Sequence, residues 1–253
     1  MDIPINARND VPYLTTEQMI EVDRAMMEDY RIELIQMMEN AGRNLAHLAR
    51  RRFLDGHPAG KQIVVLAGTG GNGGGALVCA RRLNNWGAKV RVYTTQPDNA
   101  FTHVPAHQLD ILHRMHVPVN VAHAVSRITA ADLIVDGIIG YSLSGAPYGT
   151  AADLIRWANE QTVPVLSLDA PSGVDTTIGT VFDPAIRATA TMTLALPKEG
   201  LRVPSVAANV GELYLADISV PPALYTEPAL QLKMGSIFAE SDIIRLNYKE
   251  EHS

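Results

Sequence analysis

Apolar residues along the chain follow two alternating patterns. Thr15 and Gln18 have the spacing of a helix capping box, and the segments 15–30 and 32–54 carry apolar residues at helical spacing. The run IVVLAG at 63–68 is instead apolar without alternation, which is typical of a strand buried on both faces of a parallel sheet. The sequence therefore predicts two N-terminal helices followed by a buried strand.

Short apolar runs recur after this strand, and helical segments separate several of them. Alternating strands and helices form βαβ units, so we expect an α/β fold with a mostly parallel sheet that helices cover on both faces. The predicted strands are KVRVYTT (89–95), VPVNV (117–121), DLIVDGIIG (132–140), VPVLSLD (163–169), ATATMTLAL (188–196) and ELYLADI (212–218). The predicted helices run from about 75 to 86, up to 115, and from 151 to 161.

The length of 253 residues, with 47% hydrophobic and 19% charged residues, is ordinary for one large globular domain with a sizeable core. From Pro221 onward the chain is spaced by prolines, which is typical of an arm rather than of a second domain. We therefore assign residues 1–222 to the domain and residues 223–253 to a C-terminal extension.

Charge and cysteine usage narrow the class of protein. The net charge of −6 argues against a general affinity for nucleic acid. No apolar run approaches the ~20 residues that cross a bilayer, and the start MDIPINARND lacks the basic and apolar parts of a secretory signal. The single cysteine, Cys79, excludes an internal disulfide and fits a small buried residue in a reducing compartment. We expect a soluble cytoplasmic protein that binds neither nucleic acid nor a membrane.

A glycine-rich turn follows the strand at 63–68. Gly68, Gly70 and Gly73 satisfy G-x-G-x-x-G at the start of a predicted helix, where missing side chains let a phosphate approach the backbone and the helix dipole favours an anion. The acidic residue that usually ends the next strand is absent, because the run 89–95 ends in threonines. A tight turn without a ligand is the alternative interpretation, and an ordinary dehydrogenase fits poorly.

Polar residues also stand at the ends of other predicted strands, namely Asp136, Asp169 with Ser172, and Lys198. Because ligands collect beyond the carboxyl ends of parallel strands, we expect these residues to converge with Asn72 on one pocket. Each also has a structural interpretation: Asp136 as a buried acid bonded to loop amides, Asp169 as a turn cap, and Lys198 as a solvated charge. Ser172 lies in APSGV and not in the G-x-S-x-G elbow of a hydrolase nucleophile.

Four histidines form a weaker candidate site. His103 and His107 are four residues apart and His113 and His116 three apart, so a metal pair on a helix is conceivable. The segment is polar, has no nearby cysteine and offers only Asp110 as a carboxylate. We do not predict a metal site there.

Several separate motifs, in this order along about 15–222, resemble one family. They are LIQMMENAGRNLA, GTGGNGGGALVCARRL, VDGIIGYSLSG, LDAPSGVD, LALPKEGL and ADISVPPAL. The chain resembles the YjeF N-terminal domain family, the NAD(P)H-hydrate epimerases, also called apolipoprotein A-I-binding protein in animals. The resemblance implies a three-layer αβα Rossmann-like fold, commonly dimeric, and a stand-alone epimerase.

The resemblance also implies a substrate and a cofactor. The substrate is NADH or NADPH hydrated on the nicotinamide ring (NAD(P)HX), and the enzyme interconverts its R and S epimers before a separate dehydratase repairs the S form. A potassium ion is implied, with Asn72, Asp136 and Ser172 as its side-chain ligands. The implied substrate contacts are Gly71, Asn72, Gly73, Gly74, Gly75, Gly140, Tyr141, Ser142, Leu143, Ser144, Gly145, Ala146 and Asp169.

The chemistry of that substrate suits such a pocket. Its hydrated carbon is a hemiaminal, which can lose its hydroxyl to an iminium or open its ring unaided. A catalyst needs to move a proton and stabilise the intermediate, and positioned acid–base catalysis contributes about 10²–10⁴-fold. We expect Asp169 to fill that role, with Lys198 as a second catalytic candidate that binds phosphate or keeps Asp169 ionised. Potassium would fix the loops, since a monovalent ion is a weak Lewis acid.

The chain departs from the family's usual turn, G-x-G-N-N-G-G-D-G. Gly71 replaces the first asparagine, Gly75 the aspartate and Ala76 the last glycine, while Ala146 stands where an acid is frequent. The missing carboxylate leaves a more open, less anionic pocket at the helix N-terminus. Two hypotheses follow: an NAD(P)H-hydrate epimerase, or a non-catalytic nucleotide- or metabolite-binding module on the same fold. An NAD(P)-linked oxidoreductase is disfavoured because the ribose-binding acid is absent.

Overall fold

The computed structural model of the chain describes residues 5–6, 11–122, 128–129 and 131–247. These residues build one sheet in the order β1-β9-β8-β7-β6-β5-β2-β3-β4, in which all neighbours are parallel except β8 and β9. The strands are β1 (Ile5–Asn6), β2 (Gln62–Ala67), β3 (Lys89–Thr94), β4 (Val119–Val121), β5 (Leu133–Gly137), β6 (Val165–Leu168), β7 (Ala190–Leu194), β8 (Glu212–Ala216) and β9 (Ile243–Leu246). The predicted α/β fold with a mostly parallel sheet is confirmed.

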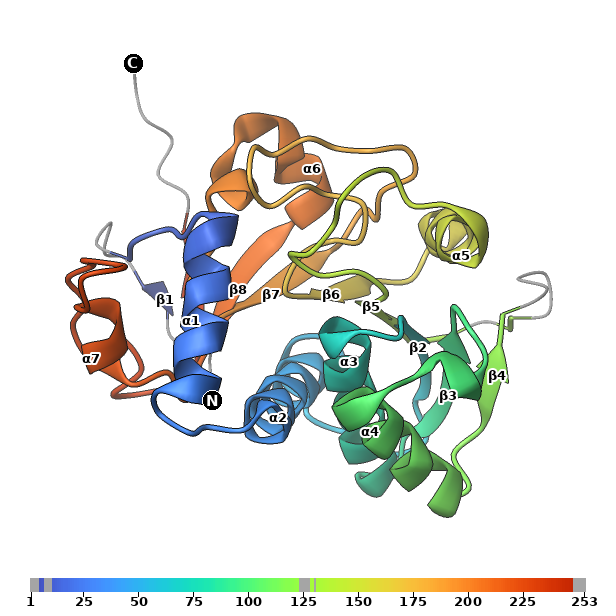
Figure 1. Ribbon diagram of the computed structural model, residues 1–253. Helices are drawn as coiled ribbons and strands as arrows, with labels where there is room; N and C mark the ends of the chain where they lie inside the picture. Colours follow the sequence, from blue (N-terminus) through green and yellow to red (C-terminus); the bar gives the residue numbers. More distant parts are fainter. Residues whose placement is uncertain (1–4, 7–10, 123–127, 130, 248–253) are drawn as a thin grey trace.

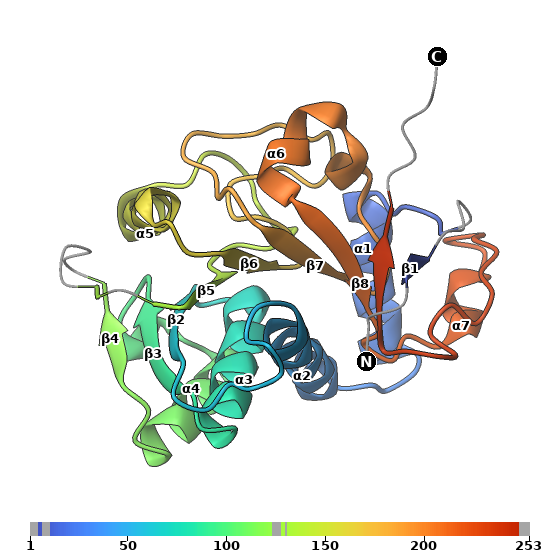
Figure 2. The ribbon, with the colours of Figure 1, turned by 180° about the vertical axis from the view of Figure 1, so that it is seen from behind.

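Helices cover both faces of the sheet (Figures 1 and 2). One face carries α2 (Leu34–Arg52), α3 (Gly71–Asn85) and α4 (His103–Arg114). The other face carries α1 (Thr16–Glu28), α5 (Gly149–Glu160) and the short α6 (Ala207–Val210), and α7 (Pro222–Tyr225) lies beside α1. Three short 3-10 turns complete the elements: η1 (Asp98–Ala100), η3 (Glu199–Arg202) and η4 (Pro204–Val206).

The central strands are apolar throughout because both of their faces are buried. On β8, Leu213 and Leu215 pack into the cluster that contains α1, whereas Tyr214 and Ala216 pack into the cluster that contains α2 and α3. Successive side chains of a strand point to opposite faces, so a strand between two helical layers needs apolar residues at every position. The unbroken apolar runs of the sequence therefore correspond to a three-layer αβα sandwich.

The start of α1 is fixed by two kinds of hydrogen bond. The predicted capping box is present, because Gln18 N donates to Thr15 Oγ1 at 3.2 Å and Thr15 N donates to Gln18 Oε1 at 2.9 Å. Just before it, Leu14 N donates to Pro197 O at 2.8 Å, and Glu199 N donates to Leu14 O at 2.9 Å. These bonds tie the beginning of α1 to the loop that follows β7.

The helix after the glycine-rich turn begins earlier than predicted. The sequence placed its start at about Gly75, but α3 begins at Gly71, and Gly74 N donates to Gly70 O at 3.0 Å. Glycines are poor helix formers by propensity, and here close packing against α2 and the sheet offsets that preference.

The predicted C-terminal extension contributes to the sheet. Its described part contains β9, which pairs antiparallel with β8 and parallel with β1. Residues 248–253 of that extension, and residues 1–4 and 7–10, on which the expectation of no secretory signal rests, lie outside the described residues. Within the described ranges, no helix is both long and apolar enough to cross a membrane.

Close contact between α2 and α3 depends on Gly42. A Cβ at this position would lie 2.4 Å from Val78 Cβ and 2.5 Å from the carbonyl oxygen of Gly75. No real side chain fits at such distances, so the two helices approach as closely as their backbones allow.

We predict that Gly42→Ala lowers the free energy of unfolding by about 1–3 kcal/mol, because the added methyl forces α2 and α3 apart. Urea denaturation measures this change. Gly235→Ala is the matched control, since a Cβ there meets nothing within 4 Å. An unchanged urea midpoint for Gly42→Ala would contradict this account of the packing.

Candidate active site

A pocket opens where the connections leaving two neighbouring strands separate. β2 leads into α3 on one face of the sheet, whereas its parallel neighbour β5 leads toward α5 on the other face. Ligands bind at such a topological switch point in open α/β sheets. Here the cavity measures about 1120 Å³, which is slightly above the roughly 300–1,000 Å³ typical of ligand pockets and suits a ligand of dinucleotide size.

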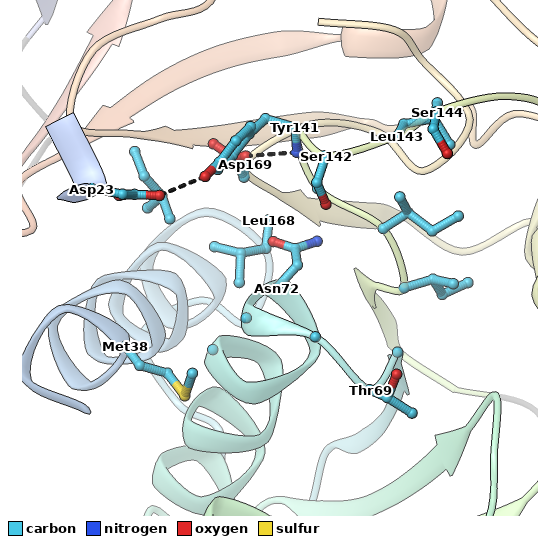
Figure 3. A pocket seen from close by; sticks show the side chains of 18 of the residues that line it. Asp23, Met38, Thr69, Asn72, Tyr141, Ser142, Leu143, Ser144, Leu168 and Asp169 are labelled. Carbon is cyan, nitrogen blue, oxygen red and sulfur yellow. Dashed lines mark hydrogen bonds between the residues drawn. The ribbon is translucent and has the colours of Figure 1, made fainter. Parts of the chain in front are cut away.

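We call this cavity the switch-point pocket (Figure 3). Its walls are the turn 68–72 with Gly75, the loop 138–151, Asp169, and side chains of α1 and α2. These five separate parts of the sequence meet around it, at the sheet edge where a pocket was predicted.

The glycines of the turn serve two different purposes. A Cβ at Gly68 would lie 2.1 Å from Ile138 O, and a Cβ at Gly73 would lie 1.8 Å from Gly68 O, so both positions need glycine for close backbone contact. At Gly70 and Gly71, by contrast, a Cβ would meet nothing within 4 Å. These two residues line the pocket and leave open space beside the N-terminus of α3, where unpaired N–H groups favour an anion.

Asp136 lies beneath the pocket with a fully buried carboxylate. It accepts hydrogen bonds from Ser172 Oγ at 2.6 Å, Ser172 N at 2.9 Å, Ser167 Oγ at 2.8 Å and Ile138 N at 3.2 Å. Burial raises the pKa of Asp136, and the hydrogen bonds from Ser172 and Ser167 oppose that rise. Ser172, also fully buried, accepts from Ile139 N at 2.9 Å, so this cluster fixes the base of the loop 138–151.

Asn72 is the second residue of α3 and lines the pocket. Its side chain packs against the loop, since a Cβ at Gly140 would lie 3.1 Å from Asn72 Cγ. Its Nδ2 is buried and has no hydrogen-bond partner among the described residues. Leaving a buried amide unpaired costs about 1–3 kcal/mol, so this group points to a partner that the protein alone does not supply.

Asp169 follows β6 and faces the pocket while its carboxylate is held from behind. Lys198 Nζ donates to Asp169 Oδ1 at 2.5 Å, and Tyr141 N donates to Asp169 Oδ2 at 3.1 Å. The ammonium group also donates to Leu194 O at 3.0 Å and to Thr193 Oγ1 at 3.3 Å. Lys198 is fully buried, so its charge is balanced within the protein by Asp169.

The backbone at Asp169 is strained. Its φ of 64° lies in the left-handed region, which residues other than glycine seldom adopt. Strain of this kind costs about 1–3 kcal/mol, persists where the surroundings dictate it, and clusters at functional sites. The ion pair with Lys198 and the bond between Asp169 N and Met192 O at 2.7 Å hold the residue in place.

Asp23, on α1, is a pocket residue that sequence analysis did not identify. Tyr141 donates its hydroxyl hydrogen to Asp23 Oδ2 at 2.5 Å (Figure 3). Burial raises the pKa of Asp23, opposed by the Tyr141 hydrogen bond and the charge of Lys198. Burial and the neighbouring Asp23 carboxylate likewise raise the pKa of Tyr141. Asp169 and Asp23 are therefore pocket carboxylates in different surroundings, one paired with a cation and one with a phenol.

The fold and this site are accompanied by a direct sequence match. The family model for the YjeF-related protein N-terminus matches residues 34–200. The chain belongs to this family.

Relatives of this YjeF-related domain include enzymes of known name. An NAD(P)H-hydrate epimerase from Dehalogenimonas lykanthroporepellens is 41% identical over 242 residues, which cover 94% of each chain. A bifunctional NAD(P)H-hydrate repair enzyme from Moorella thermoacetica is 36% identical, and the match covers 83% of this chain but 41% of that enzyme. The crystal structure of the yeast protein ynu0 superimposes with a TM-score of 0.77 at 24% identity, covering 93% of this chain and 100% of that one, and it supports the fold.

The YjeF-related domain brings most of the predicted site residues to the pocket wall. Gly71, Asn72, Gly75, the whole loop 140–146 and Asp169 line it. The other predicted contacts of the turn, Gly73 and Gly74, face elsewhere: Gly74 packs against Met38 and Gly73 against the turn itself.

Three further predicted residues, Asp136, Ser172 and Lys198, do not line the pocket. They are fully buried behind its wall. Lys198 does not line the pocket, so of its two predicted roles the geometry supports holding Asp169 and not binding phosphate.

The histidines of α4 and its C-terminal turn, and Cys79, lie in surroundings that explain them without a ligand. His113 Nε2 lies 2.8 Å from Asp98 Oδ2, and no group of three metal-binding His, Cys, Asp or Glu side chains occurs among the described residues. Cys79 is buried within α3, and burial raises the pKa of its thiol.

We predict that Lys198→Met lowers the free energy of unfolding by about 3–5 kcal/mol, because it leaves the Asp169 carboxylate buried without a cation. Adding Asp169→Asn to this variant should recover part of the loss, since no charge is then left unpaired. Denaturant unfolding measures both effects, and Lys233→Met, which replaces an exposed lysine, is the control. If Lys198→Met unfolds at the wild-type midpoint, the ion pair does not stabilise the site.

Proposed function

We propose that this protein is an NAD(P)H-hydrate epimerase, which interconverts the R and S epimers of hydrated NADH and NADPH. A relative that matches over 94% of both chains carries this name. The structural observation that carries the proposal is the position of Asp169, whose carboxylate faces the switch-point pocket while Lys198 holds it from behind. A fixed carboxylate at a switch point is what a reaction through a cationic intermediate requires.

The pocket offers separate places for the two parts of the substrate. The open positions Gly70 and Gly71, beside the N-terminus of α3, suit the pyrophosphate. The hydrated nicotinamide ring would then lie toward Asp169 and Tyr141, which are hydrogen-bonded to each other.

In this arrangement each residue has a defined role in the reaction. Loss of the hydroxyl from the hemiaminal carbon leaves an iminium cation, and the Asp169 carboxylate stabilises that charge at the pocket wall. Lys198 positions Asp169 and does not touch the substrate, because its ammonium group is fully buried. Water that adds to the opposite face of the ring gives the other epimer. Gly75 replaces the aspartate that the family usually has at this position, but this replacement does not remove the carboxylate of Asp169.

We further propose that a potassium ion binds beside Asn72, Asp136 and Ser172. The donor set fits, because it consists of a carboxylate, a hydroxyl and an amide, and such oxygen atoms are the ligands of hard cations. A half-turn of the unpaired Asn72 amide would present its oxygen to the ion. A bound cation would supply positive charge that fixes the turn at Asn72 against the loop 138–151.

The same proposal includes the cellular setting. A separate NAD(P)HX dehydratase would act on the S epimer, in keeping with the longer relatives that are named bifunctional repair enzymes. We also propose that the protein is a homodimer of the cytoplasm, a compartment that the free, buried Cys79 suits.

We predict that the wild-type protein accelerates conversion of purified R-NADHX into the S form, and that Asp169→Asn lowers this rate by about 10²–10⁴-fold. The asparagine is isosteric but cannot balance the developing cation. Chromatography against the spontaneous rate measures both, and circular dichroism checks that the variant is folded.

Two results would contradict this assignment. An Asp169→Asn rate equal to that of the wild type would remove Asp169 from the mechanism. A wild-type protein that does not accelerate the reaction, yet melts at a higher temperature with NADPH, would be a binding module on an epimerase fold.

We predict that the protein melts at a higher temperature in potassium chloride than in tetramethylammonium chloride at equal ionic strength, because an ion bound only by the folded state stabilises it. Ser172→Ala should abolish this difference, whereas the control Ser205→Ala, at an exposed serine, should retain it. Equal melting temperatures of the wild type in the two salts would exclude the ion site.

A further inference from the structure

The switch-point pocket contains a second carboxylate for which the mechanism above has no use. Asp23 reaches the pocket from α1, which comes before every other element of the site in the sequence. Its neighbours Val22 and Met26 belong to the buried core, and Asp23 itself is only partly exposed. A carboxylate placed against an apolar core costs free energy unless it is paired, and its partner here is the hydroxyl of Tyr141.

Tyr141 links the carboxylates of Asp23 and Asp169. Its backbone N–H donates to Asp169 Oδ2 at 3.1 Å, and its hydroxyl donates to Asp23 Oδ2 at 2.5 Å. Figure 3 shows Tyr141 between Asp23 and Asp169, with all three side chains at the wall of the same cavity. The ring nitrogen and the hydroxyl of a substrate bound there would lie within reach of both acids.

The surroundings of the two carboxylates suit opposite tasks. Asp169 is in contact with the ammonium of Lys198, so its carboxylate is paired with a cation at the pocket wall. Among the described residues no cation forms an ion pair with Asp23, and the adjacent Arg24 is bonded to Glu21, Glu28 and Asp29. Burial favours the protonated form of Asp23. Two acids whose environments differ in this way take the two roles of acid–base catalysis.

We propose that Asp23 and Tyr141 form the proton-donating group of the epimerase reaction, and that Asp169 is the carboxylate that faces the cation. This inference rests on the proposed epimerase function. It also accounts for an active pocket without the acid that the family usually has at the position of Gly75, because the donor comes from α1 instead.

The proton transfers balance over the two halves of the reaction. In the first half, the C–O bond of the hydrated carbon breaks and the lone pair of the ring nitrogen forms the C=N bond of the iminium. For this step the Tyr141 hydroxyl, which donates to Asp23 in the free protein, turns toward the substrate and Asp23 donates to it instead. The Tyr141 hydroxyl hydrogen passes to the departing oxygen, which leaves as water, while the carboxylic hydrogen of Asp23 passes to the Tyr141 oxygen.

In the second half, water adds to the other face, the C=N electron pair returns to nitrogen, and the proton that the water releases passes to Asp169. Exchange with solvent then removes this proton from Asp169 and returns one to Asp23, so both acids recover their starting forms. No oxidant or reductant is needed.

Steady-state kinetics of R-NADHX epimerisation test the proposal with three variants. We expect Asp23→Asn and Tyr141→Phe to lower kcat by about 100-fold or more, within the range of general acid catalysis, and to leave KM nearly unchanged. Asp23→Glu, which retains the acid, should recover part of the rate. Glu17→Gln is the matched control, an exposed acid on the same helix outside the pocket, and should behave as the wild type.

Binding of NADPH, followed by the shift in melting temperature, separates the possible outcomes. If Asp23→Asn and Tyr141→Phe retain the kcat of the wild type while Asp169→Asn is inactive, this inference is wrong. The proposed epimerase function would then still hold. Loss of NADPH binding in parallel with the rate would make Asp23 a binding residue and also overturn it. If the wild type does not accelerate epimerisation, the proposed function fails, and the inference fails with it.

Discussion

A buried ammonium group loses its hydration and is tolerated only where acceptors replace the lost water. Lys198 meets this condition with three acceptors, of which the carboxylate of Asp169 is the only charged one. The pairing has consequences beyond the two residues. It holds Asp169 in a strained backbone conformation at the pocket wall, and the hydrogen bonds of Leu14 to the residues on either side of Lys198 fix the start of α1. The position of α1 in turn places Asp23 beside the hydroxyl of Tyr141, and the backbone N–H of Tyr141 donates to Asp169.

The second constraint is topological. Because the connections after β2 and β5 run to opposite faces of the sheet, a cavity must open between them. The glycine-rich turn makes that cavity usable in two ways. Gly68 lets the backbone pack tightly against Ile138 of the loop 138–151, and Gly73 lets it pack against Gly68 within the turn. Gly70 and Gly71 keep the space beside the α3 N-terminus open. The turn therefore both permits close packing and forms part of the wall of the switch-point pocket.

Much of this arrangement could be predicted from local patterns. The unbroken apolar runs predicted the parallel sheet. The polar residues after the strands predicted a pocket at this sheet edge, but of these residues Asp136, Ser172 and Lys198 lie behind its wall. The start of α3 was misplaced because its glycines have low helix propensity, and only contacts with α2 and the sheet stabilise the first turn. Lys198 was open to interpretation as a solvated charge, since the segment around Leu14 that lies beside it is distant in the sequence.

Asp23 could have been found. It lies four residues after Met19 and three before Met26, so it occupies the buried stripe of an amphipathic helix. An acid on such a stripe needs a partner, and that is the signal that sequence analysis overlooked. What no local pattern could show is which partner it has, because Tyr141 lies 118 residues away.

We expect a hydrated nicotinamide dinucleotide to bind in the switch-point pocket. A crystal structure with NADPH, the unhydrated form that cannot react, tests this most directly. We expect the pyrophosphate beside Gly70 and Gly71 and the nicotinamide ring against Asp169 and Tyr141. A dinucleotide bound outside this pocket, or one whose nicotinamide ring points away from Asp169, would contradict the account.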